Sequence, residues 1–107
     1  MSGSGDRRTF FVSTYDTNGA THVRVGGECD AGTFAELEAT LRPLLTGSRD
    51  VVVDLAAVTF VDSMTLGSLT AAAKRIRADG RSFGVVGVRA PEVRRAFEVS
   101  GLDRYLL

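Results

Sequence analysis

Hydrophobic and polar residues alternate near the start of the chain, as they do in β-strands with one buried face. Residues 9–15 (Thr-Phe-Phe-Val-Ser-Thr-Tyr) are β-branched and aromatic, and in residues 21–25 two valines alternate with His22 and Arg24. The Asn18-Gly19 dipeptide between the two segments favours a tight turn, because both residue types accept a positive φ. These residues predict an antiparallel hairpin.

After the hairpin, the apolar positions change from strand spacing to helix spacing. Thr33 and Glu36 have the spacing of a capping box, which predicts that a helix begins there. Leucines at helical spacing follow, and we expect the helix to kink or to end early near Pro43, which lacks a backbone donor.

The remainder alternates between buried strands and helices. Continuous apolar runs indicate strands that are buried on both faces, whereas spacing of three and four residues indicates helices. Pro91 suits the first position of a helix, and glycine commonly ends one. The expected elements are a strand at 50–55, a helix from Asp62 to Gly80 with Leu66 in the core, a strand over 83–88, a helix from Pro91 to Gly101, and a last turn from Asp103.

The predicted fold class is therefore α/β, with the order β-β-α-β-α-β-α. Alternating strands and helices imply crossover connections, so we expect a mixed sheet with helices packed mainly on one face. Residues 1–8 form an expected flexible N-terminal lead, and residues 9–107 form one domain.

Composition and charge exclude several classes of function. Lys and Arg number 13 and Asp and Glu also number 13, so the chain has no bulk attraction for nucleic acid. Cys29 and His22 are the sole residues of their types, which gives no metal-ligand spacing and no catalytic constellation. We expect no enzyme activity, no catalytic residues, no metal and no cofactor. No apolar run approaches the roughly 20 residues of a membrane span, so we expect a cytoplasmic protein that does not bind membranes.

Residues 54–69 carry the most specific pattern, Asp-Leu-Ala-Ala-Val-Thr-Phe-Val-Asp-Ser-Met-Thr-Leu-Gly-Ser-Leu. A buried strand leads into a helix that begins at Asp62-Ser63, where either side chain can cap free backbone amides. A hydroxyl at this position is next to the positive end of a helix and tolerates a phosphate. Considered alone, however, Ser63 favours simple helix capping, and Asp62 is consistent with the same role.

This segment resembles the signature of STAS domains in anti-sigma factor antagonists. Gly27-Glu-Cys-Asp30 is similar to the family's Gly-Glu-hydrophobic-Asp, and Val93-Arg-Arg-Ala-Phe-Glu-Val-Ser-Gly-Leu-Asp103 is similar to its closing helix. The resemblance extends from about Thr9 to Leu107 and implies the STAS fold.

The resemblance also implies a function. In the family, the serine after the aspartate is phosphorylated by an anti-sigma factor that is itself a serine kinase, and it corresponds to Ser63. The unphosphorylated form would bind that kinase and release a sigma factor, phosphorylation would prevent binding, and a serine phosphatase would restore it. The residues expected to meet the partner are Asp30, Asp62, Ser63, Met64 and Thr65.

Met64 and Thr65 depart from the family's usual Ser/Thr-Gly at these positions. Glycine allows close approach of a partner, whereas Thr65 is expected to add a branched side chain to that surface. Thr65 is also a lesser phosphoacceptor candidate. The departure leaves an alternative open, namely a scaffold that is never phosphorylated or a domain that senses a small ligand or nucleotide. The exposed face of the hairpin strands is also compatible with a homodimer.

Overall fold

The computed structural model describes residues 9–107, so the expected flexible lead at 1–8 lies outside the described residues. Four strands form one sheet in the order β1-β2-β3-β4. β1 (Phe11–Thr17) pairs antiparallel with β2 (Ala20–Cys29), whereas β3 (Asp50–Val61) and β4 (Phe83–Val86) extend the sheet in parallel. The predicted hairpin and mixed sheet are therefore confirmed, with Asn18-Gly19 alone between the first two strands.

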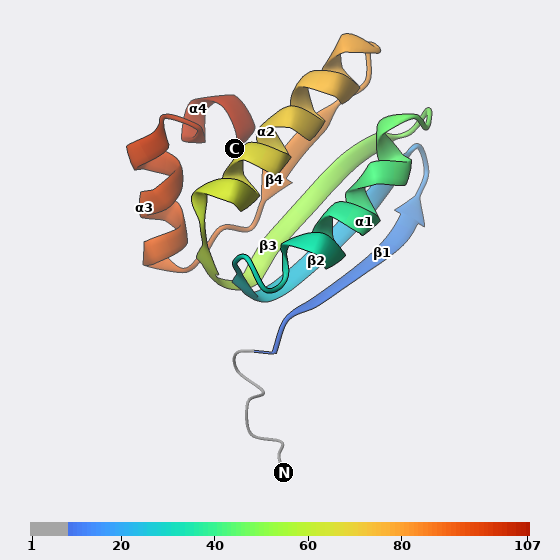
Figure 1. Cartoon of the computed structure of the whole chain (residues 1–107). Helices are drawn as coiled ribbons and strands as arrows, with labels where there is room; N and C mark the ends of the chain where they lie inside the picture. The colour runs from blue at the N-terminus through green and yellow to red at the C-terminus, as the bar shows by residue number, and fades with distance from the viewer. Residues whose placement is uncertain (1–8) are drawn as a thin grey trace.

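The helices lie mainly on one face of the sheet, as predicted (Figure 1). The helices α1 (Phe34–Leu45) and α2 (Ser63–Ala78) lie side by side on this face and pack against each other. Next to α2, α3 (Pro91–Ser100) contacts β3, and the short α4 (Asp103–Leu106) contacts β4.

The core between sheet and helices consists of aliphatic side chains, two phenylalanines and Cys29. Alternate residues of the strands, among them Val23, Val53 and Val85, face Leu69 of α2 and the other buried helical residues. Phe97 of α3 is fully buried in the same cluster. The opposite face of the hairpin carries polar and aromatic side chains, of which Tyr15 and His22 stack with their ring centroids 4.8 Å apart.

Strand β3 is six residues longer than predicted, and this difference places the candidate site. It runs to Val61 because β2 stays paired with it through two irregularities in register, between Arg24 and Gly26 and between Gly27 and Glu28. Gly27 has φ +86°, and a Cβ there would be 2.6 Å from the backbone oxygen of Thr9, so only glycine fits. The expected end of the strand at residue 55 is therefore wrong, and a single residue joins β3 to α2.

Of the two predictions at the ends of α1, one is wrong and one agrees with the structure. Thr33 precedes the helix but makes no side-chain cap, since its hydroxyl oxygen accepts from the Asp30 N–H at 3.0 Å while its O–H donates to the Glu28 carbonyl at 2.9 Å. The capping box is thus wrong. Pro43 lies within the helix, which ends two residues later, as an early end near it predicts. Arg81 donates to the exposed carbonyls of Leu44 and Leu45 at this end, at 3.0 and 2.7 Å.

Candidate functional site

Asp62 is the single residue between β3 and α2, and backbone and side-chain hydrogen bonds fix it in place. Its backbone N–H donates to the Cys29 carbonyl at 3.0 Å, which continues the pairing of β2 with β3. Its carboxylate accepts a hydrogen bond from the Thr65 backbone N–H at 2.8 Å. Asp62 is therefore the N-cap of α2, one of the two capping alternatives that the sequence left open.

Ser63 is the first residue of α2, and its side chain is exposed. Because Asp62 caps the helix, the Ser63 hydroxyl is not needed for that purpose, and it makes no hydrogen bond within residues 9–107. The partial positive charge of the helix end favours an anion at this position. Ser63 is thus an accessible hydroxyl whose modification would break no contact among the described residues.

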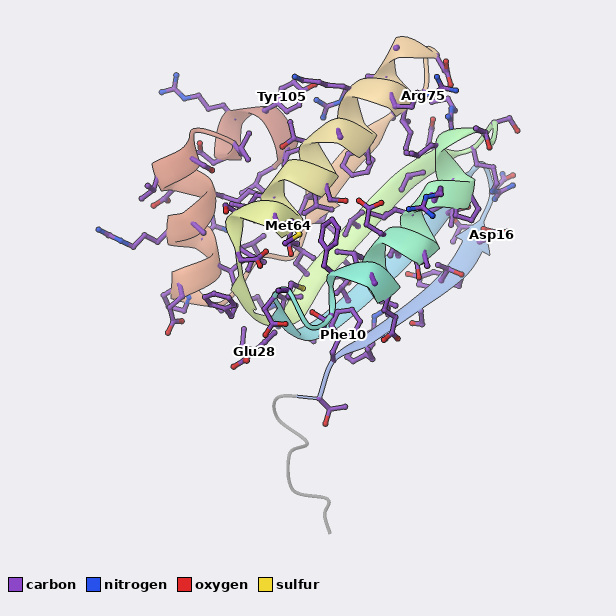
Figure 2. The ribbon with its side chains drawn as sticks, viewed as in Figure 1. Phe10, Asp16, Glu28, Met64, Arg75 and Tyr105 are labelled. Atoms are coloured by element: carbon purple, nitrogen blue, oxygen red, sulfur yellow. The ribbon has the colours of Figure 1, made fainter. Side chains whose placement is uncertain are left out.

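Met64 and Thr65, the two residues that depart from the family pattern, face opposite ways. Met64 is 46% exposed, so it lies on the surface beside Ser63 (Figure 2). Thr65 is 1% exposed, and its hydroxyl lies 3.4 Å from the Cys29 carbonyl, to which it donates. The expectation that Thr65 adds a branched side chain to the partner-facing surface is therefore wrong, because that side chain points into the core.

Asp30 lies at the same end of the sheet, in the loop that precedes α1. Its carboxylate accepts a hydrogen bond from the Gly32 backbone N–H at 2.9 Å and thereby shapes this loop. Asp30 and Asp62 both act on Cys29, which is 1% exposed. Burial first, and then the carboxylates of Asp62 and Asp30, raise the pKa of the Cys29 thiol to about 11. Both carboxylates are therefore close enough to this buried thiol to disfavour its ionised form.

Sequence reasoning missed two exposed features near Ser63. Phe60 is 45% exposed at the end of β3, where it pairs in register with Glu28. Gly67 lies one turn after Ser63 on α2, and a Cβ at this glycine would meet nothing within 4 Å. Glycine inside a helix costs about 0.5–1 kcal/mol relative to alanine, so its presence without a packing reason was the available signal.

The site therefore combines an exposed serine at a helix start with Met64, Phe60, Gly67 and nearby carboxylates. Within residues 9–107, no group of three or more His, Cys, Asp or Glu side chains is placed to hold a metal ion. No helix in the described part of the chain is long and apolar enough to cross a membrane.

Comparisons with known proteins agree with this description. The family model described as "Mlab, STAS domain" matches residues 13–107. An anti-sigma-B factor antagonist of Staphylococcus aureus is 37% identical over 81 residues, which are 75% of this chain and 74% of the relative.

Solved structures give the same result. An anti-sigma factor antagonist from Mycobacterium paratuberculosis has a TM-score of 0.84 and 32% identity, over 92% of this chain and 84% of the other. The antagonist SpoIIAA in its unphosphorylated form has a TM-score of 0.75 at 20% identity, over 92% and 86%. Bacillus SpoIIAA in its phosphorylated form has 0.66 at 19%, over 92% and 89%. The SpoIIAA structures support the fold alone.

Proposed function

Since the chain belongs to the STAS domain family of anti-sigma factor antagonists, we propose that it is a phosphorylation-controlled binding module. In this proposal, the surface around Ser63 binds an anti-sigma factor that is also a serine kinase, and a sigma factor is released. Phosphorylation of Ser63 prevents this binding, and a serine phosphatase reverses it. The protein acts in the cytoplasm.

The observation that carries the proposal is that the helix cap and the exposed hydroxyl belong to two different residues. Asp62 supplies the cap of α2, so Ser63 is exposed and uncommitted. The anti-sigma factor partner is supported by the relatives, which are named as antagonists of anti-sigma factors. Phosphorylation has a precedent in the same fold, since SpoIIAA exists in a phosphorylated form.

A phosphate on Ser63 is compatible with the fold. The helix end stabilises a negative charge by about 0.3–1 kcal/mol. The carboxylates of Asp62 and Asp30 offset part of this gain. We therefore expect the free energy of unfolding to change little upon phosphorylation.

The same phosphate is poorly compatible with a close interface. It adds nearly two charges beside Asp62, and burying them against a partner costs several kcal/mol unless the partner supplies matching cations. Exposed Phe60 and Met64 supply apolar contact area. Gly67 has no side chain, so a partner can approach the backbone of α2 closely there. A bulky group on Ser63 would therefore hold the two surfaces apart. Phosphorylation should thus weaken binding without unfolding the protein.

Thr65 is the weaker phosphoacceptor in this proposal. Its hydroxyl is buried and donates to the Cys29 carbonyl, so a kinase would reach it only after the first turn of α2 opened. Modification of Thr65 would therefore disrupt the link between α2 and β2, whereas modification of Ser63 would not.

The test is to incubate the purified chain with ATP and each anti-sigma serine kinase of its organism, and to locate any phosphate by mass spectrometry. We expect phosphate on Ser63 and none in Ser63→Ala. The matched control is Ser13→Ala, which removes an exposed hydroxyl on β1 and should leave phosphorylation unchanged.

Binding is measured in parallel by calorimetry with Ser63→Glu. We expect at least a tenfold weaker affinity and an unchanged melting temperature. Unchanged affinity with a large loss of melting temperature would contradict the proposal. Binding without phosphorylation by any kinase would instead indicate the constitutive scaffold, and absence of both would favour the sensor of a small ligand or nucleotide.

A further inference from the structure

One face of the sheet has no helix over it within residues 9–107. In Figure 1 the helices lie in front of the sheet or beside it, and the strands lie behind them. Successive residues of a strand face opposite ways, so the side chains that alternate with the buried valines point to the uncovered face. They form two rows across the four strands, Tyr15-His22-Val52-Gly84 and Ser13-Arg24-Asp54-Val86. These two rows are named the open face below.

The open face is more apolar than a sheet surface in contact with water requires. The strands β2, β3 and β4 are parallel, and parallel strands are usually covered on both faces. The valine run 51–53 has the pattern of a strand buried on both faces, yet Val52 is only half-buried and Val86 is 48% exposed. Tyr15, which is 50% exposed, adds aromatic area on β1. The open face therefore has the character of a surface that a further layer covers.

One cation and one carboxylate lie in the middle of the open face. Arg24 and Asp54 are register partners on β2 and β3, but Arg24 makes no ion pair or hydrogen bond within residues 9–107. Its guanidinium carbon lies 6.0 Å from the centroid of the Phe11 ring. One oxygen of Asp54 accepts a hydrogen bond from the Ala56 N–H at 2.8 Å. The guanidinium and the carboxylate are thus neighbours that are each able to pair with a group outside the chain.

This arrangement is complementary to itself under one two-fold axis. An axis parallel to the strands, midway between β2 and β3, turns a second copy over so that β2 faces β3 and β1 faces β4. Arg24 of each copy then lies opposite Asp54 of the other, and Tyr15 lies opposite Gly84. A Cβ at Gly84 would meet nothing within 4 Å, so this glycine leaves room for the tyrosine ring. An axis across the strands would place Arg24 against Arg24, which like-charge repulsion disfavours.

We propose that the open face is the interface of a symmetric homodimer, in which two sheets pack face to face. His22 and Val52 meet at its centre, two ion pairs join Arg24 and Asp54 across it, and Tyr15 fills the space over Gly84. None of the residues assigned above to the partner surface belongs to the open face. The dimer therefore leaves that surface accessible, and the proposal does not depend on phosphorylation.

The area of the open face limits the affinity. Four strands about 4.8 Å apart, with about six residues of ~3.4 Å each, give a face of roughly 400 Å² on each copy. A standard specific interface buries about 800 Å² on each partner, so this one belongs with the small and transient interfaces. We expect a dissociation constant of about 0.1 mM and a largely monomeric protein at low micromolar concentration.

The test is sedimentation equilibrium of the full chain from about 10 µM to about 1 mM, with nuclear magnetic resonance spectra over the same range. We expect the mean mass to rise from that of the monomer toward that of the dimer. Signals of the open face, among them Val52 and Val86, should shift with concentration. Signals of Ser63 and Met64 should not shift.

Two pairs of variants identify the contact. Gly84→Glu puts a charge where Tyr15 of the second copy would lie, and should weaken the dimer at least about tenfold. Its matched control is Gly67→Glu, which makes the same change in open space on α2 and should associate as the parent does. Arg24→Glu sets two glutamates against two aspartates and should weaken the dimer about tenfold, whereas Arg24→Lys should retain most of the affinity. Circular dichroism checks that each variant is folded.

Three results would overturn the proposal. A chain that stays monomeric at about 1 mM would mean that water or a different protein covers the open face. Equal weakening by Gly84→Glu and Gly67→Glu would mean that the copies do not meet specifically through the sheet. Unchanged association of Arg24→Glu would exclude the two-fold axis that pairs Arg24 with Asp54.

Discussion

Replacement of Gly67 by alanine should stabilise the protein and weaken its partner binding at the same time. Gly67 lies inside α2, is exposed, and has no neighbour within 4 Å of the position that a Cβ would take. The substitution therefore causes no clash within the chain. It should gain about 0.5–1 kcal/mol of stability from the lower backbone entropy of the unfolded chain. For a domain of this size, that gain corresponds to a rise of about 2–8 °C in melting temperature.

Partner binding should change in the opposite direction. Gly67 is one helical turn from Ser63, so it faces the same partner in the proposed complex. An added methyl group in a close-packed contact typically costs about 1–3 kcal/mol, which is roughly a 5- to 150-fold loss of affinity. The measurements are thermal unfolding by circular dichroism and calorimetric titration with the anti-sigma factor.

A matched glycine separates the two effects. Gly84 lies in β4 between two buried residues that point to the helix-covered face, and a Cβ there also meets nothing within 4 Å. Gly84→Ala should leave affinity unchanged. If Gly67→Ala binds the partner as tightly as the parent, α2 beyond its first turn does not contact the partner. If it lowers the melting temperature, the glycine has a packing role that the structure does not contain.

Substitutions at two residues of the site and at the far end of α2 test the framework of the fold. Asp62→Ala should cost about 1 kcal/mol in urea unfolding, because it removes the cap of α2, and Asp62→Ser should restore most of it; equal stability of the two variants would contradict the capping role. The pKa of the Cys29 thiol is raised from 9.0 to about 11, so between pH 9 and 11 the thiol stays protonated in the folded state while it ionises in the unfolded chain. The free energy of unfolding should therefore fall over this pH range. Cys29→Ala should lack this fall, and parallel pH profiles of the two proteins would refute the argument. Arg77 lies 4.7 Å from the Tyr105 ring centroid and donates to the Phe83 carbonyl, so Arg77→Ala should lower the free energy of unfolding by about 1–3 kcal/mol. Arg75 is exposed, and Arg75→Ala should change this free energy little. Similar losses in the two variants would exclude a specific role for Arg77.

The sequence was sufficient for elements whose signals are local. Asn18-Gly19 forms the hairpin turn, and Pro91 is the first residue of α3. Gly101 ends that helix with φ 76°, in the left-handed conformation that glycine favours. The core position of Leu66 also followed from helical spacing. Each of these choices is made by the backbone preferences or the spacing of a few neighbouring residues.

The sequence was insufficient where distant segments decide the outcome. The length of β3 depends on continued pairing with β2 through two irregularities, and the carbonyls at the end of α1 are satisfied by Arg81, which is 36 residues from Leu45. The hydroxyl of Thr33 accepts from the Asp30 N–H and donates to the Glu28 carbonyl, so it does not form the capping box. None of these contacts can be predicted from the residue types of a short segment.

The orientation of Thr65 was within reach of the sequence. Thr65, Leu69, Ala72 and Ile76 follow spacings of four, three and four residues, and all are buried on one face of α2. Comparison with the family pattern drew attention to the identity of Thr65, whereas the helical phase would have placed it inside. The surface departure from the family is therefore at Met64.

In the proposed switch, the arrangement of Asp62 and Ser63 lets one short segment serve both folding and regulation. A serine that capped α2 would lose its hydrogen bond upon modification, and the helix would lose stability when the protein was switched off. Here the carboxylate of Asp62 accepts a hydrogen bond from the Thr65 N–H at 2.8 Å, so it is the aspartate that stabilises the start of α2. The adjacent hydroxyl is exposed and free to change its charge. Exchanging the two residues, as Asp62→Ser with Ser63→Asp, should therefore preserve the cap and abolish phosphorylation at position 63; a large loss of melting temperature in this double variant would contradict the division of roles.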